Sequence, residues 1–119
     1  MSEGATEPSA AKIVWFELPA TDTERARGFY AKLFGWHYQP FEGQDYHMSY
    51  EAGGAIFAAS EASGPIVYFG VDDVDAAVAR VEELGGERGE KQEIPGIGFY
   101  ALVKDSEGNP IGLYQNTQA

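Results

Sequence analysis

The chain has 119 residues, and 19 acidic against 8 basic side chains give it a net charge of −11 with both histidines neutral. This charge argues against nucleic acids and anionic membrane surfaces as partners, because both require clustered lysines and arginines. The lack of cysteine excludes disulfides, thiolate nucleophiles and cysteine-bound metals. Hydrophobic residues make up 44% of the chain, so we expect a folded domain and not a disordered acidic segment.

The sequence shows no targeting signal at its start. Its first residues contain no positively charged start followed by an apolar run, so no signal peptide is expected. No stretch approaches the roughly 20 apolar residues of a membrane span. We therefore expect a cytoplasmic protein without membrane contact. Residues 1–11 lack periodicity and are predicted to form a flexible tail.

Residues 12–62 are predicted to form a module of one strand, one helix and three strands. Residues 13–18 alternate and are rich in β-formers, and Pro19 is expected to end this strand. Thr21 and Glu24 match a capping box, and Gly35 is placed to end the helix that follows. The helix carries one apolar face, made of Ala26, Phe29, Tyr30, Leu33 and Phe34. Three strand-like segments follow, at residues 36–41, 45–52 and 54–60.

Residues 63–119 repeat this order. A strand at residues 66–71 leads to Asp72 and Asp73, which are suited to begin a helix that Gly85 and Gly86 end. Strands are predicted at residues 87–92, 99–104 and 110–115. The repeat predicts an α+β fold in which two tandem βαβββ modules form a curved mixed sheet, or half-barrel, with a central cleft in one compact domain.

Strand alternation predicts which side chains face this cleft. If Val14, Phe16 and Leu18 pack beneath the first helix, Trp15 and Glu17 point the other way. If Val67, Phe69 and Val71 cover the second helix, Ile66 and Tyr68 are the residues that point away from it.

Glu17 and several aromatic residues are the candidates for chemistry in the cleft. A carboxylate beside aromatic rings suits a general base or a counter-ion for a cationic ligand, whereas a rim residue paired with lysine or arginine is the simpler alternative. Trp15, Phe57, Tyr68 and Tyr114 suit an aromatic wall that stacks a flat or cationic ligand, and ordinary core packing is their alternative role. His37 and His47 lack the spacing of a zinc-binding helix and are interpreted as surface or hydrogen-bonded polar residues.

Several strings of the sequence together carry a family resemblance. They are Trp15-Phe16-Glu17-Leu18-Pro19, Thr21-Asp22, Phe29-Tyr30, Leu33-Phe34-Gly35-Trp36, Val71-Asp72-Asp73-Val74-Asp75, Leu84-Gly85-Gly86 and Asp105-Ser106-Glu107-Gly108-Asn109. The chain from Lys12 to Gln115 thereby resembles the glyoxalase/bleomycin-resistance/dioxygenase superfamily, also called vicinal oxygen chelate proteins. The resemblance implies paired βαβββ modules, an active site in their cleft and a homodimer. In many members, four His, Gln or Glu side chains hold a divalent metal that polarises vicinal substrate oxygens.

The positions that match the superfamily's metal ligands carry other residues here. Trp15, Ile66 and Gly112 match three ligand positions, and the fourth falls near Phe57 or Ala58. None of these side chains supplies the oxygen or imidazole donors that such a cation requires. We therefore expect no metal and no cofactor. The predicted ligand-binding cleft consists of Trp15, Glu17, Phe57, Ile66, Tyr68, Gly112 and Tyr114, and no catalytic residue is assigned.

The sequence supports one leading function and two alternatives. The leading interpretation is a metal-free glyoxalase-like or bleomycin-resistance-like protein that binds a small organic ligand, cationic or aromatic, as a homodimer. The first alternative is a metal-dependent lyase, isomerase or extradiol-type dioxygenase whose metal is bound by other residues, such as His37, His47 and Glu17. The second is a structural or regulatory protein whose sheet edges pair with another chain. The identity of the ligand and of any reaction stays open.

Overall fold

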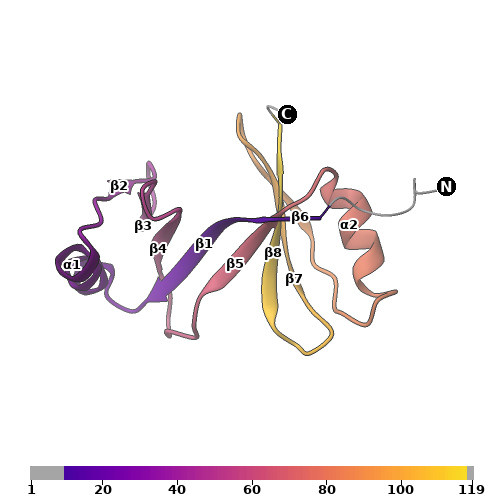
Figure 1. The fold of residues 1–119 in the computed structure, drawn as a ribbon, viewed down its shortest axis with the longest axis horizontal. Helices are drawn as coiled ribbons and strands as arrows, with labels where there is room; N and C mark the ends of the chain where they lie inside the picture. Colours follow the sequence, from indigo (N-terminus) through magenta and orange to yellow (C-terminus); the bar gives the residue numbers. More distant parts are fainter. Residues whose placement is uncertain (1–9, 118–119) are drawn as a thin grey trace. The chain divides into compact units, whose positions relative to one another are not determined.

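The computed structural model describes residues 10–117, so residues 1–9 of the predicted tail lie outside the described residues. The described elements, in chain order, are β1 (Ile13–Ala20), α1 (Thr23–Phe34), β2 (Gln39–Pro40), β3 (Tyr46–Ser49), β4 (Gly54–Ala58), β5 (Ile66–Gly70), α2 (Val74–Val81), β6 (Lys91–Ile94), β7 (Gly98–Lys104) and β8 (Pro110–Asn116). The order β-α-β-β-β occurs twice, which confirms the predicted α+β class and the repeat (Figure 1). In the described range, neither helix has the length and apolar character needed to cross a membrane.

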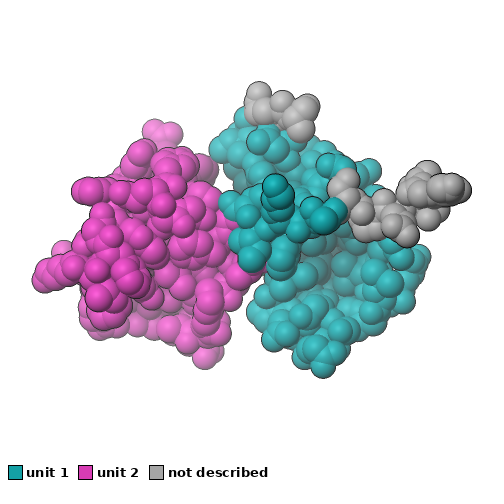
Figure 2. Space-filling view, viewed as in Figure 1, with its two compact units in different colours: residues 1–14, 68–119 teal, residues 15–67 magenta. Residues whose placement is uncertain are grey.

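The described residues form two compact units (Figure 2). Unit 2 is Trp15–Val67, and unit 1 comprises the described residues on either side of it. In unit 2 the strand order is β2-β3-β4-β1, with β1 and β4 parallel and the other neighbours antiparallel. In unit 1 the order is β5-β8-β7-β6, with β5 and β8 parallel. Each unit therefore repeats one pattern of pairing.

The core of unit 1 lies between α2 and the sheet. Its buried members are Val74, Val78, Ala101, Val103 and Leu113, with Phe99 and Ile111 packed against them. The register pairs Leu113 with both Phe69 and Ala101, so these three side chains share the face that α2 covers. Tyr68 and Gly112, one position along each strand, belong to the opposite face. The predicted assignment of Phe69 to the helix side is confirmed.

In unit 2 the same alternation places Phe16 on the helix side. The Phe16 ring lies 6.0 Å from that of Trp36, which stacks on Tyr30 of α1 at 5.3 Å. Trp15 and Glu17, which flank Phe16 in β1, therefore face away from α1. This is the orientation that the sequence predicts for them.

The structure corrects several element ends. Asp22, and not Thr21, caps α1: its backbone is extended, and its carboxylate accepts a hydrogen bond from the Arg25 N–H at 3.0 Å. Gly35, with φ of 76°, ends α1 as predicted. Pro19 does not end β1, because the pairing with β4 continues through Pro19 and Ala20. Helix α2 ends at Val81, and a turn precedes the left-handed Gly85.

Two predicted strands are also shorter or shifted. The strand predicted at residues 36–41 is reduced to Gln39–Pro40, because the Trp36 ring packs among aromatic residues of α1. The strand predicted at residues 87–92 is displaced to Lys91–Ile94, and Glu87 makes only an isolated bridge with Lys104.

The apolar face predicted for α1 is largely exposed. Thr23 is the one buried residue of this helix. The exposed fractions of Phe29, Leu33 and Phe34 are 59%, 59% and 55%. Helix α1 therefore leaves aromatic surface uncovered, whereas α2 buries Val74 and Val78.

Two glycine substitutions in unit 2 test this packing. A Cβ at Gly28 in α1 would meet nothing within 4 Å, so Gly28→Ala is expected to raise the free energy of unfolding by about 0.5–1 kcal/mol, as alanine favours a helix. A Cβ at Gly54 would lie 2.5 Å from the Phe16 carbonyl oxygen. Gly54→Ala is therefore expected to lower the free energy of unfolding by about 1–3 kcal/mol. Urea unfolding of the two variants measures both changes. If Gly28→Ala and Gly54→Ala had the same free energy of unfolding, the described packing would be contradicted.

Candidate ligand-binding site

A chain of two hydrogen bonds joins three side chains on the open face of unit 2, the face opposite α1. The Trp15 Nε1–H donates to the Tyr46 hydroxyl at 2.9 Å, and that hydroxyl donates to Glu17 Oε2 at 2.6 Å. Trp15 and Glu17 come from alternate positions of β1, and Tyr46 begins β3. The second bond has the length of a charge-assisted hydrogen bond, so Tyr46 fixes the orientation of the Glu17 carboxylate.

Phe57 extends this group along the same face. The register pairs Tyr46 with Phe57 and Glu17 with Ala55, and paired residues point to the same side of a sheet. The Tyr46 ring lies 6.4 Å from that of Phe57, and the Trp15 ring lies 6.0 Å from that of Tyr50. Three predicted site residues, Trp15, Glu17 and Phe57, are thus brought together, with Tyr46 at their centre.

The predicted residues of unit 1 form a second group. Tyr68 pairs with Gly112, and Tyr114 pairs with Tyr100, all on the face opposite α2. The Tyr68 ring meets the Tyr100 ring edge-on at 6.3 Å. The Tyr68 ring also lies directly over Gly112, so a Cβ at position 112 would collide with that ring. Ile66, the first residue of β5, falls in unit 2. That the two groups line one common cleft stays a prediction.

The two modules use equivalent register positions with different chemistry. Glu17 opposite Ala55 corresponds to Tyr68 opposite Gly112, since each pair joins the first and last strand of its module. By the same rule Phe57 corresponds to Tyr114, and Tyr46 corresponds to Tyr100. Glu17 is the carboxylate among these positions. The repeat also places Ala55, and not Phe57 or Ala58, at the position equivalent to Gly112.

Tyr46 and Tyr100 are site residues that the sequence interpretation does not include. Both lie in the third strand of their module, at the position paired with an aromatic residue of the fourth. The repeat is the feature of the sequence that could have identified them. Once Phe57 and Tyr114 are recognised as equivalent positions of the two modules, antiparallel pairing assigns Tyr46 and Tyr100 as their partners.

The residues at the superfamily's metal-ligand positions do not fit a metal ion. Trp15 uses its single N–H on Tyr46, and an indole offers no lone pair for a cation. At Gly112, the Tyr68 ring occupies the space in which a longer side chain would begin. Within residues 10–117, no group of three or more His, Asp or Glu side chains is arranged to hold a metal ion.

The two histidines lie in polar contacts elsewhere in unit 2. His47 Nε2 lies 2.7 Å from Asp45 Oδ1, which also accepts a 2.7 Å hydrogen bond from the Thr23 hydroxyl. His37 Nδ1 lies 3.1 Å from the Glu51 carboxylate. His47 pairs with Ile56 across the sheet and so points to the face opposite that of Glu17. The alternative metal set of His37, His47 and Glu17 is therefore not brought together.

The contacts of Asp45 hold its carboxyl in the charged form. The hydrogen bond from Thr23, and secondly that from His47, keep the pKa of Asp45 below its usual 3.8. The same residue joins the first residue of α1 to the start of β3. Asp45 therefore links the helix to the sheet through a charged acceptor.

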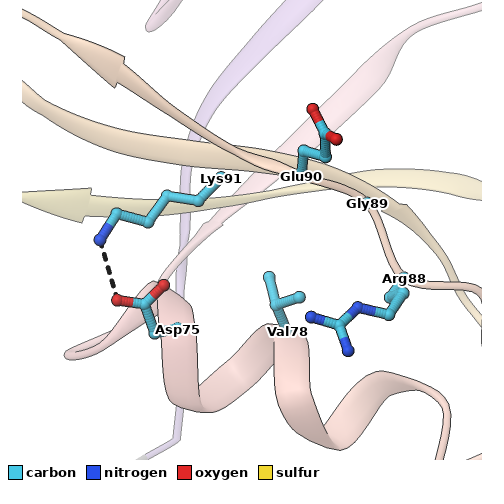
Figure 3. Close-up of a pocket in the computed structure, with 6 residues that line it drawn as sticks. All are labelled: Asp75, Val78, Arg88, Gly89, Glu90 and Lys91. Atoms are coloured by element: carbon cyan, nitrogen blue, oxygen red, sulfur yellow. Dashed lines mark hydrogen bonds and ion pairs between the residues drawn. The ribbon is translucent and has the colours of Figure 1, made fainter.

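A pocket of about 560 Å³ lies in unit 1 on the α2 side of the sheet (Figure 3). Its lining residues are Asp75, Val78, Arg88, Gly89, Glu90 and Lys91. Lys91 Nζ pairs with Asp75 Oδ2 at 2.8 Å and lies over the Phe99 ring, and the Arg88 side chain extends toward Val78 (Figure 3). The pocket contains none of the predicted site residues and lies on the opposite sheet face from Tyr68 and Gly112.

Comparison with known proteins relates this geometry to a family. Residues 14–114 match the family model described as "Glyoxalase-like domain". A glyoxylase-like domain-containing protein of Didymella fabae is 32% identical over 115 residues, which cover 82% of this chain and 88% of that protein.

Other relatives are longer than this chain. The protein of Mycobacterium tuberculosis that carries the name glyoxylase CFP32 is 36% identical over 115 residues, and the match covers 85% of this chain but only 44% of that protein. The anthracycline biosynthesis protein DnrV of Streptomyces peucetius is 27% identical over 125 residues, and the match covers 85% of this chain and 46% of that protein. The chain thus spans about half the length of these two proteins.

Among solved structures, the fold is similar to an extradiol ring-cleaving dioxygenase from B. fuscum. That match has a TM-score of 0.72 at 28% identity and covers 96% of this chain and 35% of the dioxygenase chain. Homoprotocatechuate 2,3-dioxygenase from Brevibacterium fuscum, in complex with 3,4-dihydroxyphenylacetate, matches with a TM-score of 0.71.

The role of Asp45 predicts how stability depends on pH. Because its pKa is lower in the folded chain, its contribution to stability is complete above the usual value of 3.8 and is lost as the pH falls through the folded value. Asp45→Asn is expected to flatten the decline of the melting temperature in this acid range. The exposed Asp72→Asn serves as the control, and an unchanged decline in Asp45→Asn would show that Asp45 has no such role.

Proposed function

Because the chain belongs to the glyoxalase-like domain family, we propose that it binds a small organic ligand without a metal ion. The proposed binding surface is the face of unit 2 that carries Trp15, Glu17, Tyr46 and Phe57. The observation that carries this proposal is the hydrogen-bond chain from Trp15 through Tyr46 to Glu17. It presents one oriented carboxylate among aromatic rings, and the position of Glu17 is equivalent to that of Tyr68 in the other module.

The chemistry of this face favours a flat ligand that carries a cationic or N–H group. Aromatic rings such as Trp15 and Phe57 supply surface for stacking, and an ammonium group is attracted both to ring faces and to Glu17. The Tyr46 hydroxyl donates a hydrogen bond to Glu17 Oε2, which orients the carboxylate toward the role of a counter-ion. The net charge of −11 further attracts cations from solution.

The relatives support an aromatic ligand class. One relative is named for anthracycline biosynthesis, and an anthracycline is a fused-ring aromatic compound. The dioxygenase with a similar fold is described in complex with 3,4-dihydroxyphenylacetate, whose ring is also aromatic. For this chain we propose only the shared chemistry, which is a flat ring bound against aromatic side chains.

A metal-dependent lyase, isomerase or dioxygenase is the second candidate. Its support is the fold similarity to the extradiol dioxygenase, with a TM-score of 0.72. The residues at Trp15, Ile66 and Gly112 argue against it, because they provide no ligating side chain, and the Tyr68 ring covers Gly112.

A ligand screen tests the leading proposal. Flat aromatic amines are expected to raise the melting temperature, since a ligand at 100 times its Kd adds about 2.7 kcal/mol of stability. Glu17→Gln should weaken the binding of the best compound about tenfold or more, because a charged hydrogen-bonding partner is lost. Glu61→Gln, which changes an exposed carboxylate outside this face, is the matched control. Equal affinities for the two variants, or no stabilising compound, would refute the proposed site.

Metal analysis separates the two candidates. Protein purified without chelators is expected to hold far less than one equivalent of Zn, Ni, Fe or Mn, and a chelator should leave its melting temperature unchanged. Elemental analysis by mass spectrometry measures the metal content. A stoichiometric metal that activity or stability depends on would favour the second candidate.

A further inference from the structure

The pocket on the α2 side of unit 1 is bordered by an interruption in the sheet. Glu87 pairs with Lys104 of β7 in an isolated bridge, and the regular ladder begins at Lys91, which pairs with Ala101. Three residues, 88–90, therefore lie opposite two residues of β7, which is the pattern of a β-bulge. Bulges change the direction of side chains, and they are frequent beside functional sites. This bulge therefore determines which side chains of the segment point toward α2.

Gly89 fixes the bulge against β7. A Cβ at position 89 would collide with the Leu102 carbonyl oxygen, so a residue with a side chain could not approach the strand this closely. The bulge is thus held by contact between two main chains. Because Arg88 directly precedes Gly89, the place from which its side chain starts is determined by the same contact.

The bulge brings two basic residues to the same side of the sheet. Arg88 and Lys91 are three residues apart, and in a regular strand residues at this spacing point to opposite faces. Here Lys91 extends to Asp75 of α2, and Arg88 extends on the same side (Figure 3). The Glu90 carboxylate points away from the helix (Figure 3). The interior of the pocket therefore has an excess of positive charge on a chain that is strongly acidic.

The two basic side chains differ in how far they are already engaged. Lys91 Nζ pairs with Asp75 Oδ2 at 2.8 Å and lies 4.4 Å from the centre of the Phe99 ring. Within residues 10–117, the Arg88 guanidinium has no hydrogen-bond or ion-pair partner. Val78, a buried residue of the unit 1 core, supplies an apolar wall of the same pocket. The pocket thus combines one available guanidinium with an apolar surface.

We propose that this pocket binds a small organic carboxylate. The planar guanidinium of Arg88 can donate two parallel hydrogen bonds to a carboxylate, whose two oxygens match its geometry. The apolar body of the ligand lies against Val78, and the pair of Lys91 and Asp75 borders its other end. A volume of about 560 Å³ lies within the range of small-molecule sites. The site goes beyond the proposed function, because it lies in the other unit and selects the opposite ligand charge.

An NMR titration of the full chain with sodium benzoate, at constant pH and ionic strength, tests the pocket. The amide signal of Gly89 and the methyl signals of Val78 are expected to shift as benzoate is added. Benzamide, which has a similar shape without the charge, should shift them far less at the same concentration. Phenyl phosphate distinguishes a carboxylate site from a general oxyanion site. No shift with benzoate, equal shifts with benzamide, or tighter binding of phenyl phosphate would overturn the proposal.

Substitutions of Arg88 test its role directly. Arg88→Gln should weaken benzoate binding about fivefold or more, because a charged hydrogen-bond donor is lost. Arg88→Lys keeps the charge without the planar fork and should recover only part of the affinity. Arg25→Gln removes an exposed positive charge from unit 2 and is the matched control. Equal weakening in Arg88→Gln and Arg25→Gln would show a general effect of net charge and would refute the site.

Two further measurements make the result unambiguous. Circular dichroism and thermal melting are expected to show that Arg88→Gln folds like the unchanged chain, because Arg88 is exposed. Glu17→Gln should leave benzoate binding unchanged, since Glu17 lies in the other unit. Failure of this pocket can therefore be distinguished from failure of the binding surface around Glu17.

Discussion

In both modules the parallel pairing of the first strand with the last strand determines which side chains can act together. Glu17 stands opposite Ala55, and Tyr68 stands opposite Gly112. A shift of one residue in either pairing would move every side chain of that strand to the other face. The helix would then face Glu17 or Tyr68, and the open face would receive Phe16 or Phe69. The core, the hydrogen-bond chain and the tyrosine group all follow from these two registers.

The two modules show how one backbone pattern supports unequal chemistry. In unit 2 the open face holds a carboxylate that accepts a hydrogen bond from Tyr46, and the Tyr46 hydroxyl in turn accepts one from Trp15. In unit 1 the equivalent place holds Tyr68, whose ring packs against Tyr100 and over Gly112. A carboxylate is hydrated and needs polar partners, whereas a tyrosine ring can fill apolar space. The repeat therefore supplies one polar group and one packed group in place of two identical half-sites.

Much of this arrangement could be predicted from the sequence, because it depends on local periodicity. Alternation in β1 assigns Trp15 and Glu17 to one face, and the matching segments of the two halves reveal the repeat. Contacts between strands that are distant in sequence could not be predicted, and Tyr46 is the clearest case. Its hydroxyl meets Glu17, 29 residues earlier, through pairing that no local pattern encodes. The exposure of α1 could not be predicted for a similar reason, because periodicity identifies an apolar face but not the surface that covers it.

The contact between Tyr68 and Gly112 constrains how this chain could change. A glutamate at position 112 is a single replacement in sequence, but its side chain would start inside the Tyr68 ring. A smaller residue at position 68 is therefore required as well, and that change alone would leave an unfilled space beside Tyr100. The two positions form a coupled pair in which each single step is costly and only the combination is accommodated. Directed evolution toward a ligating side chain at position 112 would therefore have to vary both residues together.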